Sequence, residues 1–108
     1  MRVIAGRLGG RNFASPHGNK THPMSDKVRG ALFNSLGDIE GLRCLDAFAG
    51  TGALAFEAIS RGATTALALE NDPSAQRTID ENIKELKLYR QVKLVKAAAG
   101  SWLDNLLC

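Results

Sequence analysis

The sequence is poor in features that define several large classes of protein. Its 108 residues include three prolines, 6% aromatic residues and two cysteines, Cys44 and Cys108. One cysteine lies inside an apolar run and the other at the last position, which does not suit a disulfide framework and fits a reducing compartment, so a cytoplasmic location is expected. No stretch approaches the roughly 18 apolar residues of a membrane span, and "MRVIAGRLGG" lacks the apolar core of a secretion signal. Secretion and membrane insertion are therefore not expected.

The chain also lacks the length for two domains and the ligands for a metal. With 44% hydrophobic residues it has material for one modest core, so one globular unit is expected. The two histidines, His17 and His22, lie in a loop with no cysteine or acid at ligand spacing. We therefore expect no metal site.

What the sequence does have is an uneven distribution of charge. The net charge is +3, but residues 1–29 carry six Lys or Arg and one acid, whereas residues 30–108 carry eight bases and ten acids. Basicity is thus a property of the N-terminal segment, which suggests a polyanion such as RNA as a partner. Charge alone leaves open the alternative of a solvated basic tail that only maintains solubility.

Residues 1–23 are expected to form a basic arm and loop that precede an α/β domain over residues 24–108. The β-like runs "RVIAG" and "RNFAS" flank "RLGG", whose glycines can adopt the positive φ of a tight turn, so a β-hairpin is expected. The stretch "SPHGNKTHP" that follows is a loop by composition. The basic residues of this segment that would contact RNA phosphates are Arg2, Arg7, Arg11 and Lys20.

From residue 25 onward, helical and strand patterns alternate. A helix is expected from Ser25, a good N-cap, to Gly37. Strands are expected over residues 43–48, 65–70 and 91–96, helices over 53–60 and 74–88, and a further helix beginning within 101–107. The residues expected to share the apolar face of the first helix are Val28, Ala31, Leu32 and Leu36. Strands that alternate with helices imply βαβ units, and hence a parallel sheet with right-handed crossovers.

A glycine turn follows the first expected strand. Gly50, Gly52 and Ala55 fit G-x-G-x-x-[GA], and Glu70 ends the next strand, where an acid can bind ribose hydroxyls. This combination indicates a nucleotide-like cofactor in a crevice at the carboxyl ends of the strands. A glycine turn that serves only strand–helix packing is the alternative.

Asp46 indicates which cofactor such a turn would hold. A pyrophosphate near the turn would be repelled by a carboxylate at the end of the strand, so Asp46 disfavours a dinucleotide such as NAD. S-adenosylmethionine has no phosphate and carries an ammonium and a sulfonium, which a carboxylate attracts. A carboxylate that only caps the following turn remains the structural alternative.

Three stretches carry a resemblance to a known family. "MRVIAGRLGGRNF", "THPMSDKVRGALFNSLG" and "LDAFAGTGALAFEAISRGA" resemble successive blocks of the bacterial small-subunit ribosomal RNA guanine-N2 methyltransferases, over about residues 1–83. The resemblance implies an incomplete Rossmann-like class I methyltransferase fold, S-adenosylmethionine as the methyl donor, and the exocyclic N2 of a guanine in ribosomal RNA, free or in a small-subunit assembly intermediate, as the acceptor. By the same resemblance, the donor-binding residues are Asp46, Phe48, Gly50, Thr51, Gly52, Glu70, Asn71 and Asp72.

The sequence departs from the family pattern in several places. His22 and Gly30 replace an arginine and a glutamate that the family usually has, and Ala98 stands where the family often has Asp or Asn to accept from the adenine amine. The family's catalytic loop, Asn or Asp followed by Pro-Pro-Tyr or Pro-Pro-Phe, is absent, since no two of the three prolines are adjacent. No catalytic residue is therefore assigned.

Two functions remain open from the sequence. The favoured one is the donor-binding part of a longer methyltransferase, because a three-stranded half sheet leaves a hydrophobic edge. The alternative is a non-catalytic RNA-binding remnant. A dinucleotide-dependent enzyme is disfavoured by Asp46.

Overall fold

The computed structural model describes residues 1–15, 25–47 and 49–107 of the chain. Lys20, His17 and His22 of the expected arm and loop, and Phe48 of the expected donor site, lie outside the described residues. The elements, in chain order, are α1 (Asp26–Leu36), β1 (Arg43–Asp46), α2 (Ala53–Ser60), β2 (Thr65–Leu69), α3 (Pro73–Leu86), β3 (Val92–Val95) and α4 (Ala99–Leu107).

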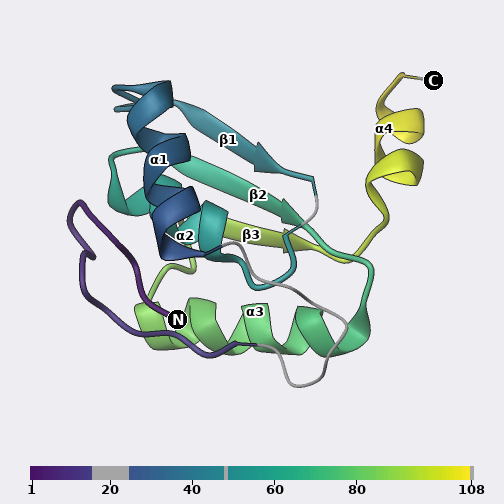
Figure 1. Ribbon diagram of the computed structural model, residues 1–108. Coiled ribbons are helices and arrows are strands. Elements are labelled where there is room, and N and C mark those ends of the chain that lie inside the picture. The colour runs from purple at the N-terminus through teal and green to yellow at the C-terminus, as the bar shows by residue number, and fades with distance from the viewer. Residues whose placement is uncertain (16–24, 48, 108) are drawn as a thin grey trace.

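The three strands form one parallel sheet in the order β1-β2-β3 (Figure 1). Leu45 of β1 is in register with Leu67 of β2, and Leu67 is in register with Lys93 of β3. Each connection between neighbouring strands contains a helix, α2 after β1 and α3 after β2. The parallel α/β architecture expected from the alternating pattern is confirmed.

Local sequence signals account for the ends of the helices. The hydroxyl of Ser25 accepts a hydrogen bond from the Val28 amide at the start of α1, and the carboxylate of Asp72 accepts one from the Ala75 amide at the start of α3. Such caps satisfy amides that have no partner within the helix. Gly37, with a φ of 72°, follows the end of α1. No helix in the described ranges has the length and apolar character needed to cross a bilayer.

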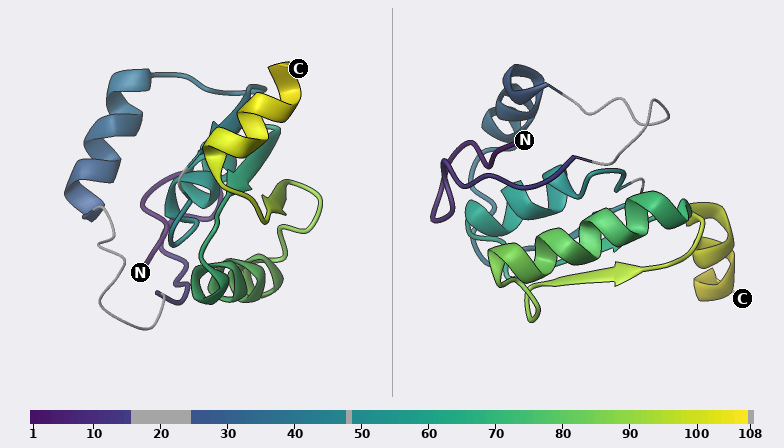
Figure 2. Two further views of the ribbon diagram at one scale, coloured as in Figure 1. Left: turned by 90° about the vertical axis from the view of Figure 1, so that its right-hand side faces the viewer. Right: turned by 90° about the horizontal axis from the view of Figure 1, so that it is seen from below.

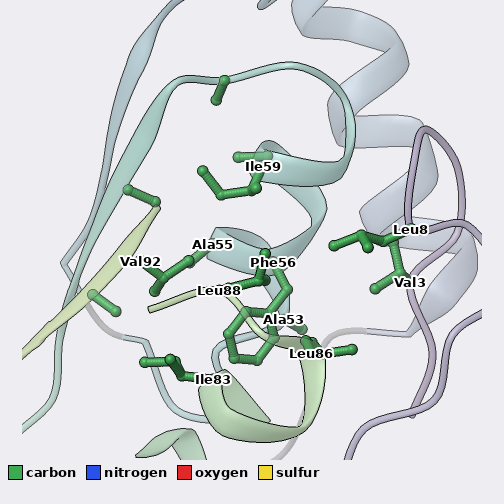
Figure 3. Close-up of a cluster of buried hydrophobic side chains, with 14 of the residues drawn as sticks. Val3, Leu8, Ala53, Ala55, Phe56, Ile59, Ile83, Leu86, Leu88 and Val92 are labelled. Carbon is green, nitrogen blue, oxygen red and sulfur yellow. The ribbon is translucent and has the colours of Figure 1, made fainter. Parts of the chain in front are cut away.

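The core lies between the sheet and helices α2 and α3, which pack on the same side of it (Figure 2, right). Phe56 of α2 is fully buried and points toward Leu86 and Leu88 of the third helix and its following turn (Figure 3). Phe13 of the N-terminal segment packs edge-on against Phe56, with 5.2 Å between ring centroids. The N-terminal segment is therefore part of the fold and closes one end of its core.

The β-hairpin expected in this segment is not present. Its two halves are joined by an isolated antiparallel bridge between Arg2 and Asn12 and by backbone hydrogen bonds such as the one from the Val3 amide to the Arg11 carbonyl, at 2.9 Å, but no strands form. The reason is that its backbone amides hydrogen-bond to α2: the amides of Ile4 and Ala5 donate to the carboxylate of Glu57, at 2.9 and 3.1 Å. The amides of residues 7 and 8 likewise donate to Ser60, so these donors are not available for a strand ladder.

The apolar face expected for α1 is also not the face that it buries. Val28 and Leu36 remain 54% and 58% exposed, whereas Arg29 and Phe33 are buried. Arg29 is drawn inward by Glu57, whose carboxylate is also fully buried and lies 3.5 Å from the Arg29 Nε. Because burial of one charge without the other is costly, this ion pair decides the rotation of the helix.

Candidate functional site

The candidate site forms at the carboxyl ends of β1 and β2. Asp46 ends β1, and Glu70 follows β2 directly. The glycine turn between β1 and α2 is joined to the second strand by a hydrogen bond from the Ala49 amide to the Leu69 carbonyl, at 2.9 Å. The fold thus brings the turn and both acids together at the carboxyl ends of the parallel strands, where ligands of such sheets usually bind.

The side chain of Glu70 accepts hydrogen bonds from three backbone amides at this site. Its Oε1 accepts a hydrogen bond from the Gly50 amide at 2.7 Å, and its Oε2 accepts from the amides of Asn71 and Asp72 at 3.0 and 2.8 Å. A carboxylate oxygen offers about two lone-pair positions, so Oε1 retains room for one further donor. A hydroxyl group is suited to that position.

The glycine turn has the conformation that its residue types permit. Gly50 and Gly52 have φ values of 53° and 83°, in the left-handed region. A Cβ on Gly52 would lie 2.7 Å from the ring of Phe56, so a side chain at that position would collide with the core. The second glycine therefore allows close packing of turn and helix, while Gly50 presents its backbone to Glu70.

A pocket of about 260 Å³ opens beside Glu70. Glu70 is its one charged residue, and small apolar side chains form much of the wall. The residues that line it are Ala47, Leu69, Glu70, Asn71, Ala97, Ala98 and Ala99. A flat, weakly polar group fits such walls, with polar recognition limited to Glu70, Asn71 and the main chain.

The side chains of two further predicted donor-site residues, Asp72 and Thr51, accept hydrogen bonds at the starts of helices. The Asp72 carboxylate caps α3, and the Thr51 hydroxyl accepts from the Ala53 amide at 3.1 Å at the start of α2. Asp46 is half-buried and lies on the side of the sheet that faces α2, in register with Ala68. Of the predicted set, the pocket beside Glu70 brings together Glu70 and Asn71.

Sequence reasoning missed Gln76. Its side-chain Nε2 donates to the Glu70 carbonyl at 2.8 Å, which ties the first turn of α3 to the end of β2. The sequence signal that could have indicated this contact is the position of Gln76, one turn inside the helix that Asp72 caps. A glutamine side chain at that position is long enough to hydrogen-bond to the backbone just before the helix, and in this chain it holds the backbone of Glu70 in place.

Two of the predicted RNA contacts are engaged within the fold. Arg2 forms an ion pair with Asp26 at 3.2 Å, and Arg11 donates to the Glu85 carbonyl at 3.2 Å. Arg7 is exposed. Arg2 and Arg11 therefore contact different helices, α1 and α3.

The three-stranded parallel sheet with helical crossovers, a glycine turn after β1 and an acid after β2 is an arrangement that nucleotide-binding α/β proteins share. Its structural matches are to class I methyltransferases. The structure superposes on the protein yhhF of Escherichia coli with a TM-score of 0.85 and 36% identity, over 95% of this chain and 55% of that one. It also superposes on the C-terminal domain of precorrin-6Y C5,15-methyltransferase from Rhodobacter capsulatus, with a TM-score of 0.74. At 21% identity, the second match shows the fold alone.

Residues 1–107 match the family described as "Conserved hypothetical protein 95", and the chain belongs to that family. It is 38% identical over 104 residues to the ribosomal RNA small subunit methyltransferase D of Escherichia coli K12, covering 95% of this chain and 52% of that protein. The protein of the same name from Haemophilus influenzae is 39% identical over 88 residues, covering 81% of this chain and 46% of that protein. The chain thus spans about half the length of these relatives and is homologous to ribosomal RNA methyltransferases.

Proposed function

We propose that this chain is the donor-binding part of an S-adenosylmethionine-dependent methyltransferase whose acceptor is the exocyclic N2 of a guanine in small-subunit ribosomal RNA. The observation that carries the proposal is the hydrogen bond between Glu70 and the glycine turn. It holds an acid next to a glycine backbone that a ligand can approach closely, beside a pocket at the carboxyl ends of the strands. Membership of the family and the names of the relatives support the acceptor class.

The chemistry of the donor set fits S-adenosylmethionine. When bound, the donor supplies a methyl group on a positively charged sulfur. Asp46 would attract the adjacent ammonium, and the remaining acceptor position on Glu70 Oε1 would take a ribose hydroxyl. A dinucleotide would instead bring a pyrophosphate close to the carboxylate of Asp46, which costs Coulomb energy in a partly desolvated crevice.

The base of the donor would enter the pocket lined by Ala97, Ala98 and Ala99. No side chain among those three accepts a hydrogen bond, so an exocyclic amine beside them would bond to main-chain carbonyls or to water. We therefore assign adenine recognition to packing and backbone groups.

The acceptor side of the reaction requires residues that this chain does not supply. Methyl transfer needs the lone pair of the amine directed at the sulfonium carbon, and a flipped base must be stacked and held. The Pro-Pro-aromatic loop that performs this in the resembling family does not occur in the sequence. We assign that step to the portion of the relatives that lies beyond the matched half.

Calorimetry with S-adenosylhomocysteine and with NAD tests the proposal. We expect the 108-residue chain to bind S-adenosylhomocysteine and not NAD, with binding weakened in Glu70→Gln. Binding of NAD alone would favour a dinucleotide enzyme. Binding of neither, together with retention of RNA binding, would favour a non-catalytic RNA-binding protein.

A further inference from the structure

The turn between α3 and β3 is held firmly against the core. The amide of Leu88 donates to the Ile83 carbonyl at 2.9 Å, and the amide of Gln91 donates to the Leu88 carbonyl at 3.2 Å. The Leu88 side chain is buried in the core (Figure 3). Tyr89 and Arg90 therefore occupy the two central positions of a tight turn whose ends are fixed.

Tyr89 is an exposed aromatic residue at the tip of this turn. It is 65% exposed, whereas Leu86 and Leu88 before it are buried. Leaving a ring of that size in water forgoes the free energy that burial would supply. Among the described residues from α3 to β3, it is the one large apolar side chain that is exposed. The turn thus presents a ring that the core does not use.

Basic side chains gather at the same end of α3. Lys84, Lys87 and Arg90 follow one another at intervals of three residues, and all are exposed. Arg11 of the N-terminal segment joins them, because its guanidinium donates to the Glu85 carbonyl, in the last turn of α3 (Figure 1). Glu85 is the one acid in this stretch. The α3-end surface consists of Arg11, Lys84, Lys87, Tyr89 and Arg90.

Helix electrostatics explain only part of this surface. Cations are favourable near the C-terminus of a helix, where carbonyls lack partners within the helix, and Lys84 and Arg11 occupy such positions. Arg90 lies beyond the helix, in the turn, and the uncharged ring of Tyr89 gains nothing from the helix dipole. A ligand that binds both cations and an aromatic ring accounts for these residues together.

Single-stranded nucleic acid carries both of the groups that such a surface binds. Its phosphates pair with Lys and Arg, and its unpaired bases stack on aromatic rings with little regard to sequence. A protein partner would instead favour a cluster of apolar residues at the centre of the surface, whereas Tyr89 stands among charged neighbours.

We propose that the α3-end surface binds RNA, with an unpaired base stacked on Tyr89 and the flanking phosphates held by Arg11 and Arg90. That the nucleic acid is RNA rests on the proposed function. The surface itself is independent of donor binding and of methyl transfer.

The α3-end surface lies far from the proposed donor site. Helix α3 begins at Pro73, close to Glu70, and its 14 residues at a rise of 1.5 Å each separate its two ends by roughly 20 Å. The RNA segment bound here is therefore a different part of the molecule from the guanine that receives the methyl group. Such a surface favours an RNA that is large enough to reach both ends of the domain.

Fluorescence anisotropy of the full 108-residue chain with a labelled single-stranded RNA of mixed sequence tests the role of the ring. Tyr89→Ala should weaken binding by about fivefold or more, because a stacked base is lost. Tyr89→Phe keeps the ring and should retain the parent affinity. Heparin, a polyanion without bases, should bind the parent and Tyr89→Ala equally. The matched control is Leu103→Ala, at an exposed apolar residue of α4, which should leave RNA binding unchanged.

Lys84→Gln combined with Arg90→Gln tests the role of charge and leaves Lys87, with its positive φ, in place. The slope of log affinity against log salt concentration should fall by roughly 1.4, since each lost phosphate contact on a single strand contributes about 0.7. Arg77→Gln, at an exposed arginine in the first half of the same helix, should leave the slope unchanged. Circular dichroism checks that each variant is folded.

Three results would overturn the proposal: no RNA binding by the parent, parent-like RNA binding by Tyr89→Ala, or an equal loss of heparin binding in that variant. Calorimetry with S-adenosylhomocysteine separates these outcomes from failure of the proposed function. RNA binding that depends on Tyr89 in a chain that does not bind S-adenosylhomocysteine would support the surface and count against the donor site. Donor binding together with RNA binding that ignores Tyr89 would do the reverse.

Discussion

The carboxylate of Glu70 accepts a hydrogen bond from the backbone amide of Gly50, 20 positions earlier in the sequence, at 2.7 Å. The bond holds the glycine turn after β1 against the end of β2. It also means that the acid expected to bind ribose already orders the glycine turn that is expected to bind the donor. Glu70 therefore has a structural role through the same carboxylate that we propose binds the donor.

Replacing either acid of the site should weaken donor binding. Asp46→Ala and Glu70→Ala should each reduce the affinity for S-adenosylhomocysteine by about 1–3 kcal/mol, because a charge-assisted interaction is lost. Isothermal titration calorimetry measures the change. Glu81→Gln, on the exposed side of α3, is the control, and unchanged affinity in both site variants would remove the proposed site.

The 108-residue chain on its own should not transfer a methyl group to RNA. The donor site that we propose at Asp46 and Glu70 lies within this chain, but orientation of an acceptor amine requires groups that we assign to the second half of the family. Incorporation of radiolabelled methyl groups into ribosomal RNA is the measurement. Turnover by a preparation of verified mass would show that the described half suffices.

If the arm holds RNA phosphates, binding should depend steeply on salt. The logarithm of the affinity should fall with that of the salt concentration by a slope of roughly 0.7 for each phosphate contact on single strands. Arg7→Ala combined with Arg11→Ala should reduce the slope accordingly, with little effect on base preference. If the plots of affinity against salt concentration are shallow and parallel for parent and variant, the basic residues of the arm do not hold RNA. They would then contribute to packing of the arm on the fold, as the hydrogen bond from Arg11 to the Glu85 carbonyl does.

Loss of the buried carboxylate of Glu57 should destabilise the fold. Glu57 accepts from the amides of Ile4 and Ala5, and it forms ion pairs with Arg29 and Arg61, at 3.5 and 2.8 Å. Glu57→Gln leaves Arg29 buried without a full counter-charge, which should lower the free energy of unfolding by about 3–5 kcal/mol. Urea denaturation measures this.

The matched control for Glu57 is Glu81→Gln, which replaces an exposed glutamate in the neighbouring helix. It should change the unfolding free energy by less than about 0.5 kcal/mol. Equal unfolding free energies for the two variants would mean that the interactions of Glu57 only offset the cost of removing its charge from water.

The contact between the arm and α1 should weaken in acid. A hydrogen bond from Arg2, aided by the charge of Arg29, holds the pKa of Asp26 below its ordinary value of 3.8. A lowered carboxylate pKa contributes stability above the ordinary value, and this contribution is lost as the pH falls through the lowered pKa. Because Asp26 is exposed to solvent, the contribution is less than about 1 kcal/mol.

The measurement for Asp26 is the difference in unfolding free energy between the parent and Asp26→Asn, followed from neutral pH downward. The difference should be largest at neutral pH, should shrink from about pH 3.8 downward, and should close only below the lowered pKa, where the carboxylate of the folded parent also becomes neutral. A difference that persists in acid would show that the charge of Asp26 is not what joins the arm to the helix.

Much of this protein follows from short-range patterns. Ser25, Asp72 and Pro73 mark the starts of two helices, and Gly37 marks the end of one, because capping and backbone preference act within a few residues. The alternation of strands and helices likewise determines the parallel sheet. The positions of Asp46, the glycine turn and Glu70 along the chain then place them at one end of the sheet.

Only the tertiary structure decided which groups those elements bury and hold. The apolar stripe of α1 predicts a core face, yet Arg29 turns inward because a carboxylate from α2, Glu57, lies 28 positions away in the sequence and close in space. The same carboxylate takes the amides of Ile4 and Ala5, so the expected hairpin does not form. Periodicity reports what a segment can bury by itself, whereas a buried charge must follow its partner, and the position of that partner is set by the fold.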